Sequence, residues 1–372
     1  MEYTVFGDTG IEVSRLGFGA MRLPMVGEGD DKDVDYDKAV EMIHHAFENG
    51  VNYIDTALYY NDGKSEVAVG RALKGWRDQV YLSTKNPIKN DSGSDWRERL
   101  ETSLEKLDTD YIDFYHMWGI NWETFTDKID VPNGPLEAAH QAKEEGLIKH
   151  ISFSFHGSGE DLKKIVNTGH FESMLVQYNL LDRHNEEGIA LAKEKGLGVV
   201  VMGPVGGGRL ASPSTKLQNM MPGSSSSVET ALKFVLANQN VDIALSGMEN
   251  IDMVKQNIEI ASKAGSLTAE EKKKVEEMVE ENKKLADLYC TGCEYCLPCP
   301  QNVNIPRVFE IYNFHNVYGL TEHARSQYQE LLDDEDQFGP RACVECGQCL
   351  DKCPQEIEII EKLKEADKVL SE

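Results

Sequence analysis

Eight cysteines form two runs near the C-terminal end of the chain, and the chain holds no others. The second run reads C-x-x-C-x-x-C-x-x-x-C-P, and the first has the same pattern with one residue fewer before its last cysteine. Tight C-x-x-C turns bring several thiolates and backbone N–H groups around one centre, as a [4Fe-4S] cluster requires. The runs therefore predict two [4Fe-4S] clusters, with the ligands Cys290, Cys293, Cys296, Cys299, Cys343, Cys346, Cys349 and Cys353.

The spacing of the second run resembles that of bacterial two-cluster ferredoxins. That resemblance implies that each run supplies three ligands to one cluster and its proline-flanked fourth ligand to the other. The two sets would be Cys290, Cys293 and Cys296 with Cys353, and Cys343, Cys346 and Cys349 with Cys299. The shorter step from Cys296 to Cys299 departs from the ferredoxin pattern and leaves this exchange open.

Two other uses of the cysteines are weighed against the clusters. Pairs of the C-x-x-C type also suit zinc, although a third and fourth cysteine in each run are surplus to a zinc knuckle. A disulfide framework is typical of short secreted chains, not of a chain of 372 residues.

Composition points to a cytoplasmic protein. The N-terminal segment has no basic region followed by an apolar stretch, and no apolar run reaches the length of a membrane span. The net charge of -26 disfavours a nucleic-acid-binding surface. We therefore expect neither a membrane nor a nucleic acid among the partners.

Upstream of the cysteines, strand-like apolar runs alternate eight times with amphipathic helical segments. We predict strands at 15–20, 51–55, 80–84, 112–118, 149–153, 173–177, 198–202 and 242–246. The helices are predicted at 37–49, 64–74, 94–107, 134–145, 158–168, 185–195, 226–238 and 251–263. Eight such units predict a (β/α)8 TIM barrel over residues 1–266, with residues 1–13 as a hairpin that plugs its bottom. The alternative, an open doubly wound sheet, lacks a G-x-G-x-x-G after the first strand.

Residues 267–372 are expected to form a charged helical connector at 268–289 and a small, mainly helical ferredoxin-like domain. The segment 305–334 between the two cysteine runs has a helical pattern with several aromatic residues. The fold class is therefore α/β, a barrel followed by an iron–sulfur domain.

Catalytic groups of a TIM barrel come from the carboxyl ends of its strands. The segment GVNYIDTALYYNDGKSEVAVGRAL, which contains Asp55 and Tyr60, resembles the aldo-keto reductase family and reproduces its D-T-A-x-x-Y element. The stretches VYLSTK, which ends at Lys85, VQYNLLDR around Gln177, and SGMENIDMVKQN match the same family in the same order. As a whole, the chain is similar to the aldo-keto reductases that carry a C-terminal ferredoxin-like domain.

Asp55, Tyr60 and Lys85 could act together as a proton donor. Tyrosine ordinarily ionises near pH ~10, so its use as an acid near neutrality needs a nearby cation. Lys85 can supply that charge, and Asp55 can hold Lys85 in place. A nicotinamide hydride would then reduce a small-molecule carbonyl while Tyr60 protonates its oxygen. The alternative is a structural salt bridge beside a packed tyrosine.

The fourth catalytic residue departs from the family pattern. The family carries a histidine three positions after the tyrosine of a D-x-Y-x-x-H strand, and Trp118 occupies that position here. His116 lies two residues earlier on the same face of the strand. We weigh a catalytic role for His116 against a hydrogen-bonded place inside the barrel, and we expect Trp118 to shape the substrate pocket. His156 is the other candidate to replace the missing imidazole.

The resemblance also implies cofactor contacts. Ser154, Gln177 and Met202 match positions around the nicotinamide, and Gly206, Gly207 and Gly208 match the loop over the pyrophosphate, for which a plain turn is the alternative. Gly247, Gln256 and Asn257 match the adenosine-binding stretch. In the family, a basic residue binds the 2′-phosphate of NADP, and Met253 stands at that position here, with Glu249 nearby. Lys255 or Arg209 could supply the missing positive charge. Both NADP and NAD therefore stay open as cofactors.

Three hypotheses follow for the function. The first is an NAD(P)H-dependent carbonyl reductase with structural or regulatory clusters. Nicotinamides pass two electrons as hydride and clusters pass one at a time, so coupling them normally needs a flavin or a similar centre. The second hypothesis is therefore an electron-transfer protein with a ferredoxin or flavoprotein partner and a flavin or substrate in the barrel. The third is a non-enzymatic ligand- or redox-sensing protein.

Overall fold

The computed structural model describes residues 1–27, 32–90, 92–180, 182–211, 214, 224–263, 273, 277, 296–316, 318–334, 338–353 and 357–371. The chain divides into two compact units. The first unit consists of Met1–Gly206 and Ala231–Ser266, and the second of Gly207–Thr230 and Leu267–Glu372. The domain boundary drawn at 266 from the sequence stays a prediction, and the segment 207–230 groups with the second unit.

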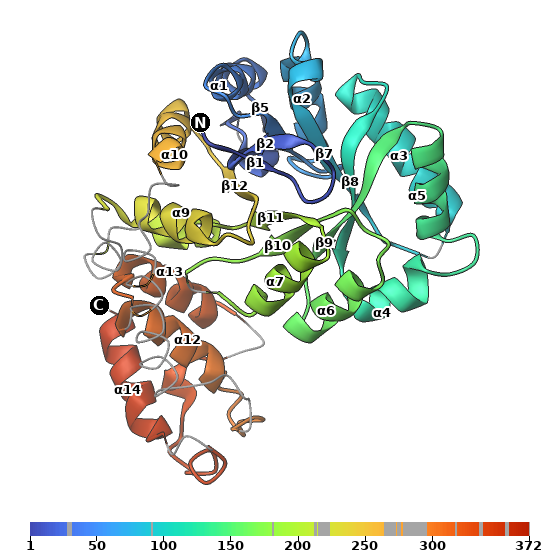
Figure 1. The fold of residues 1–372 in the computed structure, drawn as a ribbon. Coiled ribbons are helices and arrows are strands. Elements are labelled where there is room, and N and C mark those ends of the chain that lie inside the picture. Colours follow the sequence, from blue (N-terminus) through green and yellow to red (C-terminus); the bar gives the residue numbers. More distant parts are fainter. Residues whose placement is uncertain are drawn as a thin grey trace. The chain divides into compact units, whose positions relative to one another are not determined.

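Eight parallel strands close into a barrel in the first unit, and their order round the barrel follows the chain. The predicted TIM barrel is thereby confirmed (Figure 1). The strands are β3 (Leu16–Gly19), β6 (Tyr53–Asp55), β7 (Tyr81–Pro87), β8 (Ile112–Ile120), β9 (Ile148–Phe155), β10 (Ser173–Gln177), β11 (Gly198–Met202) and β12 (Ile243–Gly247).

A helix follows each barrel strand, and its apolar stripe faces the sheet as the sequence periodicity requires. The helices are α1 (Tyr36–Glu48), α2 (Ser65–Leu73), α3 (Gly93–Leu107), α5 (Pro135–Glu144), α6 (Gly159–Asn167), α7 (Glu186–Glu194), α9 (Ser227–Ala237) and α10 (Ile251–Lys263). Side chains cap several of them, since Asp35, Ser92 and Ser158 each accept a backbone N–H of the first turn of α1, α3 and α6. Each such cap contributes about 1 kcal/mol.

An N-terminal hairpin closes the amino end of the barrel. Strands β1 (Tyr3–Val5) and β2 (Glu12–Ser14) pair antiparallel. Phe6 between them packs edge-on against Phe114 with ring centroids 4.9 Å apart, inside an apolar cluster that includes Tyr53 and Val200. The expected plug is confirmed, and it leaves the opposite end of the strands for polar side chains.

Several short elements were not anticipated from the sequence. They are the hairpin β4 (Met25–Val26) with β5 (Asp33–Val34), the turns η1 (Ala20–Arg22), η3 (Arg77–Gln79) and η5 (Gly206–Ala211), and the helix α4 (Trp122–Thr124) with the π-helix η4 (Phe125–Ile129). Strands β7 and β8 also extend further than expected, to Pro87 and Ile120. These additions lie in connections, where periodicity carries little information.

The second unit is helical where it is described. The expected helical segment 305–334 is confirmed as α12 (Ile305–Asn316) and α13 (Thr321–Leu332), with the buried side chains of Phe309 and Tyr312 on α12. Helix α14 (Ile359–Leu370) was missed, and it holds the other two through hydrogen bonds from Tyr312 to Glu365 (2.7 Å) and from Tyr328 to Asp367 (2.6 Å). The turn η7 (Pro340–Ala342) precedes the second cysteine run. Nearly all of the predicted connector 268–289 lies outside the described residues.

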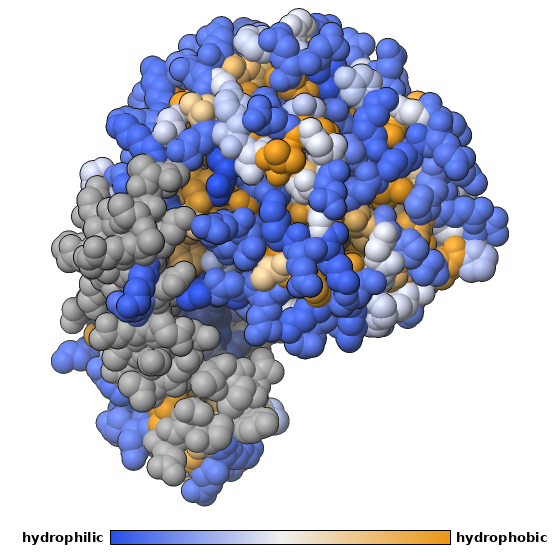
Figure 2. Space-filling view, viewed as in Figure 1, coloured by the Kyte–Doolittle hydropathy of each residue, from blue (hydrophilic) through white to orange (hydrophobic). Residues whose placement is uncertain are grey.

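Hydrophilic side chains cover most of the face of the first unit that Figure 2 shows, with apolar side chains in small scattered patches. Within the described part of the chain, no helix is both long and apolar enough to span a membrane.

Candidate active site and cysteine pocket

Two neighbouring strands place an acid and a base together at the carboxyl end of the barrel. Asp55 ends β6, Lys85 lies on β7, and both side chains are almost fully buried. The Lys85 ammonium pairs with Asp55 Oδ1 and donates a second hydrogen bond to the Thr56 carbonyl over 2.7 Å. Buried charges persist only when they are paired in this way.

Tyr60 lies beside this ion pair, in the turn that follows β6. The Lys85 ammonium is 4.8 Å from the centroid of its ring, and the Tyr60 side chain is only partly buried. Burial alone would lower the pKa of Lys85, but the Asp55 carboxylate and the Tyr60 hydroxyl outweigh burial and raise it. Lys85 is therefore a fixed cation, and the structure brings together the three residues that the sequence predicted.

His116 lies inside the barrel, away from solvent. Its side chain is fully buried, and its Nε2 is 2.8 Å from the hydroxyl of Ser83 on β7. Ser83 in turn donates to Asp55 Oδ2 over 2.7 Å. Burial and the Lys85 charge lower the pKa of His116 to about 3, so its ring is neutral near pH 7. A role in catalysis for His116 stays a prediction. In the structure, Ser83 connects the His116 ring to Asp55.

Trp118 lies at the end of β8, where it forms an aromatic wall with Tyr59 and Tyr60. Its ring centroid is 5.6 Å from that of Tyr60 in an edge-on arrangement and 6.3 Å from that of Tyr59. The exposed His156 side chain follows β9, and a methyl group at Gly119 would come within 3.6 Å of its Cδ2. Both residues that we assigned to substrate contacts therefore lie at the carboxyl ends of adjacent strands.

Three neighbouring strands carry the residues predicted to hold a nicotinamide. The buried Ser154 hydroxyl on β9 accepts the Gly119 N–H over 2.8 Å. Gln177 ends β10 directly opposite Met202 of β11 in the strand register. Gly203 is so close that a methyl group there would come within 2.7 Å of the Gln177 amide. These residues lie on three consecutive strands, β9, β10 and β11, at the carboxyl end of the barrel. Their contact with a cofactor stays a prediction.

The glycine-rich loop after β11 has a backbone that only glycine adopts readily. Gly206, Gly207 and Gly208 have φ angles of 57°, 66° and 98°, in the left-handed region. The Gly206 N–H donates to the Gly203 carbonyl over 2.8 Å, and the absence of a Cβ at three consecutive positions leaves room for a close approach of a ligand to the backbone.

An ion pair occupies the place expected for the adenosine end of a dinucleotide. Arg22 NH1 donates to Glu249 Oε1 over 3.0 Å, and a methyl group at Gly247 would stand 3.4 Å from Arg22 Cδ. Gly247, Met253, Lys255 and Gln256 are exposed, whereas the buried Asn257 donates to the Ser246 hydroxyl over 3.0 Å. The Arg209 side chain lies outside the described residues. Sequence reasoning missed Arg22, although β3 and β12 are neighbours in any closed eight-stranded barrel.

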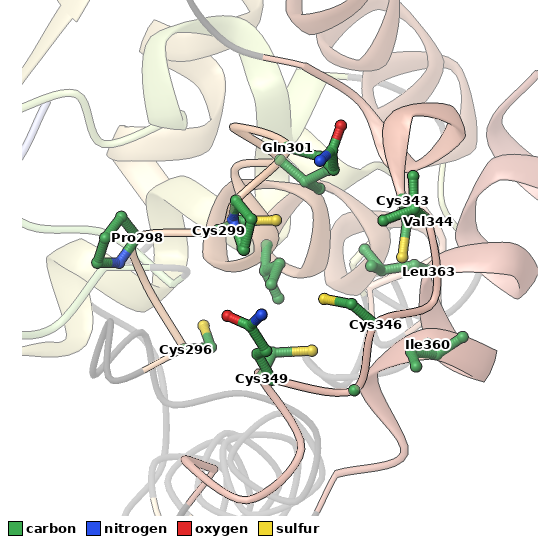
Figure 3. Close-up of a pocket in the computed structure, with 15 residues that line it drawn as sticks. Cys296, Pro298, Cys299, Gln301, Cys343, Val344, Cys346, Cys349, Ile360 and Leu363 are labelled. Carbon is green, nitrogen blue, oxygen red and sulfur yellow. The ribbon is translucent and has the colours of Figure 1, made fainter.

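Thiols from both cysteine runs line one pocket in the second unit. Figure 3 shows Cys343 and Cys346 on one side of this pocket and Cys296 and Cys299 on the other, with Cys349 between them. Buried apolar residues, including Val303 and Leu363, complete the lining. Among the described residues, no three His, Cys, Asp or Glu side chains stand close enough to hold a single metal ion. The thiols of the described cysteines therefore line a pocket and do not converge on a single atom.

Backbone pairing ties the two cysteine runs together. Val303, just after the first run, forms a parallel bridge with Phe338, just before the second. Gly347, with φ at 76°, turns the chain between Cys346 and Cys349. Burial and the neighbouring thiols of Cys343, Cys299 and Cys346 raise the pKa of Cys349. These four cysteines are the set that the ferredoxin resemblance implies, but Cys296 of the other set lines the same pocket, so the exchange of ligands stays a prediction. Cys290 and Cys293 lie outside the described residues, so the second set stays a prediction.

Comparison with known proteins agrees with this geometry. The model of the aldo/keto reductase family matches residues 15–228, and that of the 4Fe-4S dicluster domain matches residues 289–358. This chain belongs to the aldo/keto reductase family. It is an oxidoreductase of that family with a 4Fe-4S domain at its C-terminal end, as the sequence predicted.

The relatives of this reductase resemble its first unit. The uncharacterized oxidoreductase YqkF of Bacillus subtilis is 31% identical over 299 residues, which cover 71% of this chain and 92% of YqkF. The NADH-specific methylglyoxal reductase of Escherichia coli is 30% identical over 58% of this chain and 71% of its own length. Among solved structures, aldo-keto reductase AKR11C1 from Bacillus halodurans in its holo form matches with a TM-score of 0.63 and 32% identity, over 75% of this chain and 96% of its own.

Ser83 is the main residue of this reductase that sequence reasoning missed. The signal was present, because Ser83 precedes Lys85 by two residues and therefore shares its face of β7. Its importance depends on how β6 and β8 are aligned with β7, and the sequence of one strand does not contain that information.

Proposed function

We propose that this reductase reduces a small carbonyl compound with a nicotinamide as hydride donor, and that Tyr60 donates the proton. The observation that carries the proposal is the buried Asp55–Lys85 ion pair beside the partly buried Tyr60. An ion pair with a purely structural role would not require a partly exposed tyrosine beside its ammonium group. Ser154 on β9 and Gln177 at the end of β10 support a nicotinamide at the same end of the barrel.

Tyr60, Lys85 and Asp55 each have a separate role in the proposed reaction. Reduced nicotinamide would supply two electrons and a hydrogen as hydride. Tyr60 transfers its hydroxyl proton to the carbonyl oxygen, and Lys85 stabilises the phenolate that remains. A unit charge about 5 Å from the phenolate contributes ~3 kcal/mol at an effective dielectric constant of 20. Asp55 and the Thr56 carbonyl hold two of the three ammonium protons, which leaves one to face Tyr60.

The substrate wall of the site is aromatic. Trp118 and Tyr59 flank Tyr60, and Lys89 donates to the Tyr59 hydroxyl over 2.8 Å. Indole and phenol rings favour a substrate with a flat or apolar body beside its carbonyl group. We therefore infer an aldehyde or ketone with such a body as the substrate class.

The pair Arg22–Glu249 supports NADH over NADPH. Glu249 already neutralises Arg22, and its carboxylate would repel the 2′-phosphate that distinguishes NADPH. Met253 nearby offers no positive charge. We therefore expect NADH to be used with the higher kcat/KM.

Anaerobic turnover tests this function. Purified holoprotein is mixed with NADH or NADPH and a panel of aromatic and aliphatic aldehydes and ketones, while nicotinamide absorbance and cluster absorbance are recorded together. We expect carbonyl-dependent oxidation of NADH while the cluster spectrum stays unchanged. Turnover that requires reduced ferredoxin and proceeds without nicotinamide would instead establish the electron-transfer alternative.

The thiol pocket supports cluster binding in the second unit. Cys299, Cys343, Cys346 and Cys349 would hold one [4Fe-4S] cluster, and Cys290, Cys293, Cys296 and Cys353 would hold the other. Such clusters carry one electron at a time. The buried apolar side chains of the lining, such as Val303 and Leu363, would limit the access of water to a cluster held there.

Removing one thiol of each set tests the ligand assignment. We expect Cys299→Ser and Cys353→Ser each to lower bound iron and sulfide from about eight to about four per chain, because each set of four thiolates holds one cubane. The double variant should retain neither cluster. Iron and sulfide counts with electron paramagnetic resonance after reduction provide the measurement. A Cys299→Ser protein with full iron content would show that Cys299 is not a cluster ligand. A protein with both Cys299→Ser and Cys343→Ser should keep one cluster, and the loss of both would show that the two runs do not exchange their last ligands.

A further inference from the structure

A chain of hydrogen bonds runs through the barrel interior from His116 to the Asp55–Lys85 pair. His116 on β8, Ser83 on β7 and Asp55 on β6 belong to three consecutive strands, and 2% or less of each side chain is exposed. The distances are 2.8 Å from His116 Nε2 to Ser83 Oγ and 2.7 Å from Ser83 Oγ to Asp55 Oδ2. Each link has the length of a good hydrogen bond.

The chemistry of the groups sets the direction of every bond in the chain. An ionised carboxylate only accepts, so Ser83 must donate its single hydroxyl proton to Asp55. Ser83 can then only accept from His116, whose Nε2 must carry a proton. His116 is therefore a neutral imidazole with its proton on Nε2, and that proton is committed to Ser83 rather than to a substrate.

We propose that Ser83 and His116 are positioning residues, which hold Asp55 on Lys85 and so keep the Lys85 ammonium aimed at Tyr60. This inference rests on the proposed carbonyl reduction by Tyr60. Asp55 is held at both oxygens, by Lys85 at Oδ1 and by Ser83 at Oδ2, so its carboxylate cannot turn away from the lysine. Lys85 is held by Asp55 and the Thr56 carbonyl in the same way.

The ionisable groups around this chain are few. Lys85 interacts with Asp55 and Tyr60, and its charge also acts on His116 and on Glu66 of α2. Tyr53 on β6 faces Asp55, and burial together with that carboxylate raises its pKa well above the usual range. Near neutrality the two charges at the centre of the chain are therefore those of Asp55 and Lys85.

Substitutions at Ser83 test the proposal through the pH profile of kcat/KM. The Ser83 hydrogen bond favours the ionised carboxylate, so its loss in Ser83→Ala raises the pKa of Asp55. As pH falls, Asp55 then becomes neutral sooner and releases Lys85. We expect a decrease in kcat/KM of about 10-fold near neutrality and an acid limb displaced to higher pH. Ser83→Thr keeps the hydroxyl and should restore both.

Ser14→Ala is the matched control. Ser14 is also a fully buried serine of the first unit, and its hydroxyl donates to the Leu16 carbonyl over 2.7 Å in the N-terminal hairpin, at the amino end of the barrel. It should leave the acid limb in place. A displacement of the acid limb equal to that of Ser83→Ala would overturn the proposal, because it would follow from any lost interior hydroxyl.

A second measurement does not depend on activity. In protein with ¹⁵N-labelled histidine, the His116 signal, assigned by its absence in His116→Gln, should show protonated Nε2 and unprotonated Nδ1 throughout the range from pH 5 to 8. Ser83→Ala should change its Nε2 shift, and Ser14→Ala should not. A His116 that titrates in this range, or that carries its proton on Nδ1, would refute the chain even if carbonyl reduction is established. A correct tautomer in a protein without carbonyl turnover would refute the proposed function instead.

Discussion

The Tyr60→Phe variant is expected to lose carbonyl reduction by a factor of about 10³, with KM for the nicotinamide unchanged. The substitution removes one oxygen and with it the proposed proton donor beside Lys85, and positioned acids contribute about 10²–10⁴ in rate. The ring that contacts Trp118 and Lys85 is retained. The measurement is kcat in the anaerobic nicotinamide assay, with thermal unfolding to confirm that the fold is intact.

Tyr3→Phe controls for the loss of a tyrosine hydroxyl. Its hydroxyl donates to the Gly50 carbonyl over 2.8 Å, and Tyr3 lies in the N-terminal hairpin at the opposite end of the strands. This variant should retain wild-type kcat. A Tyr60→Phe protein that turns over as fast as the control would exclude Tyr60 as the acid, and proton transfer would have to come from another group such as His156.

The Lys85→Met variant is expected to lose both activity and stability. Methionine fills the space of the lysine stem but leaves the Asp55 carboxylate buried without its cation. Breaking a buried pair on one side costs about 3–5 kcal/mol of unfolding free energy. All four tryptophans, at positions 76, 96, 118 and 122, belong to the first unit. Urea unfolding followed by tryptophan fluorescence therefore reports on the barrel alone.

Two comparisons isolate the charge in this variant. The double variant Lys85→Met with Asp55→Asn has no buried charge at this ion-pair site, and it should recover about 2 kcal/mol relative to the single variant while remaining inactive. The loss in Lys85→Met should also shrink as pH falls. Burial raises the pKa of Asp55 and Lys85 opposes that effect, so removal of Lys85 raises the pKa further, and the neutral acid that forms at low pH is cheaper to bury. A loss that is equal at pH 5 and pH 8 would contradict a charge-based cause.

The barrel could be predicted because its elements depend on local pattern. The strand at 173–177 and the helix at 251–263 coincide with β10 and α10, since a short continuous apolar run marks the strand and apolar residues at every third or fourth position mark the helix. Glycine after helices, and Asp or Ser before them, mark the ends for equally local reasons. The elements that escaped notice, such as β4, β5 and η4, lie in connections without such a repeat.

The candidate site was predictable only in part. Asp55, Tyr60 and Lys85 could be named from the D-T-A-x-x-Y element and the strand end at Lys85, and the cysteine ligands from their spacing. The connection of His116 to Asp55 through Ser83 could not be predicted, because Ser83 is 28 positions from Asp55 and 33 positions from His116 along the chain. Their contact depends on the register in which β6, β7 and β8 pair.

The sequence by itself therefore determined the repeating βα units, the chemical identity of the proton donor with its cation, and the number and spacing of the thiols. Only the tertiary structure decided that His116 contacts Ser83, that Arg22 pairs with Glu249, and that Cys296 and Cys299 share a pocket with Cys343, Cys346 and Cys349. The physical reason is the same in each case. Periodicity and spacing act within a few residues, whereas strand register and packing bring together groups that lie far apart in the chain.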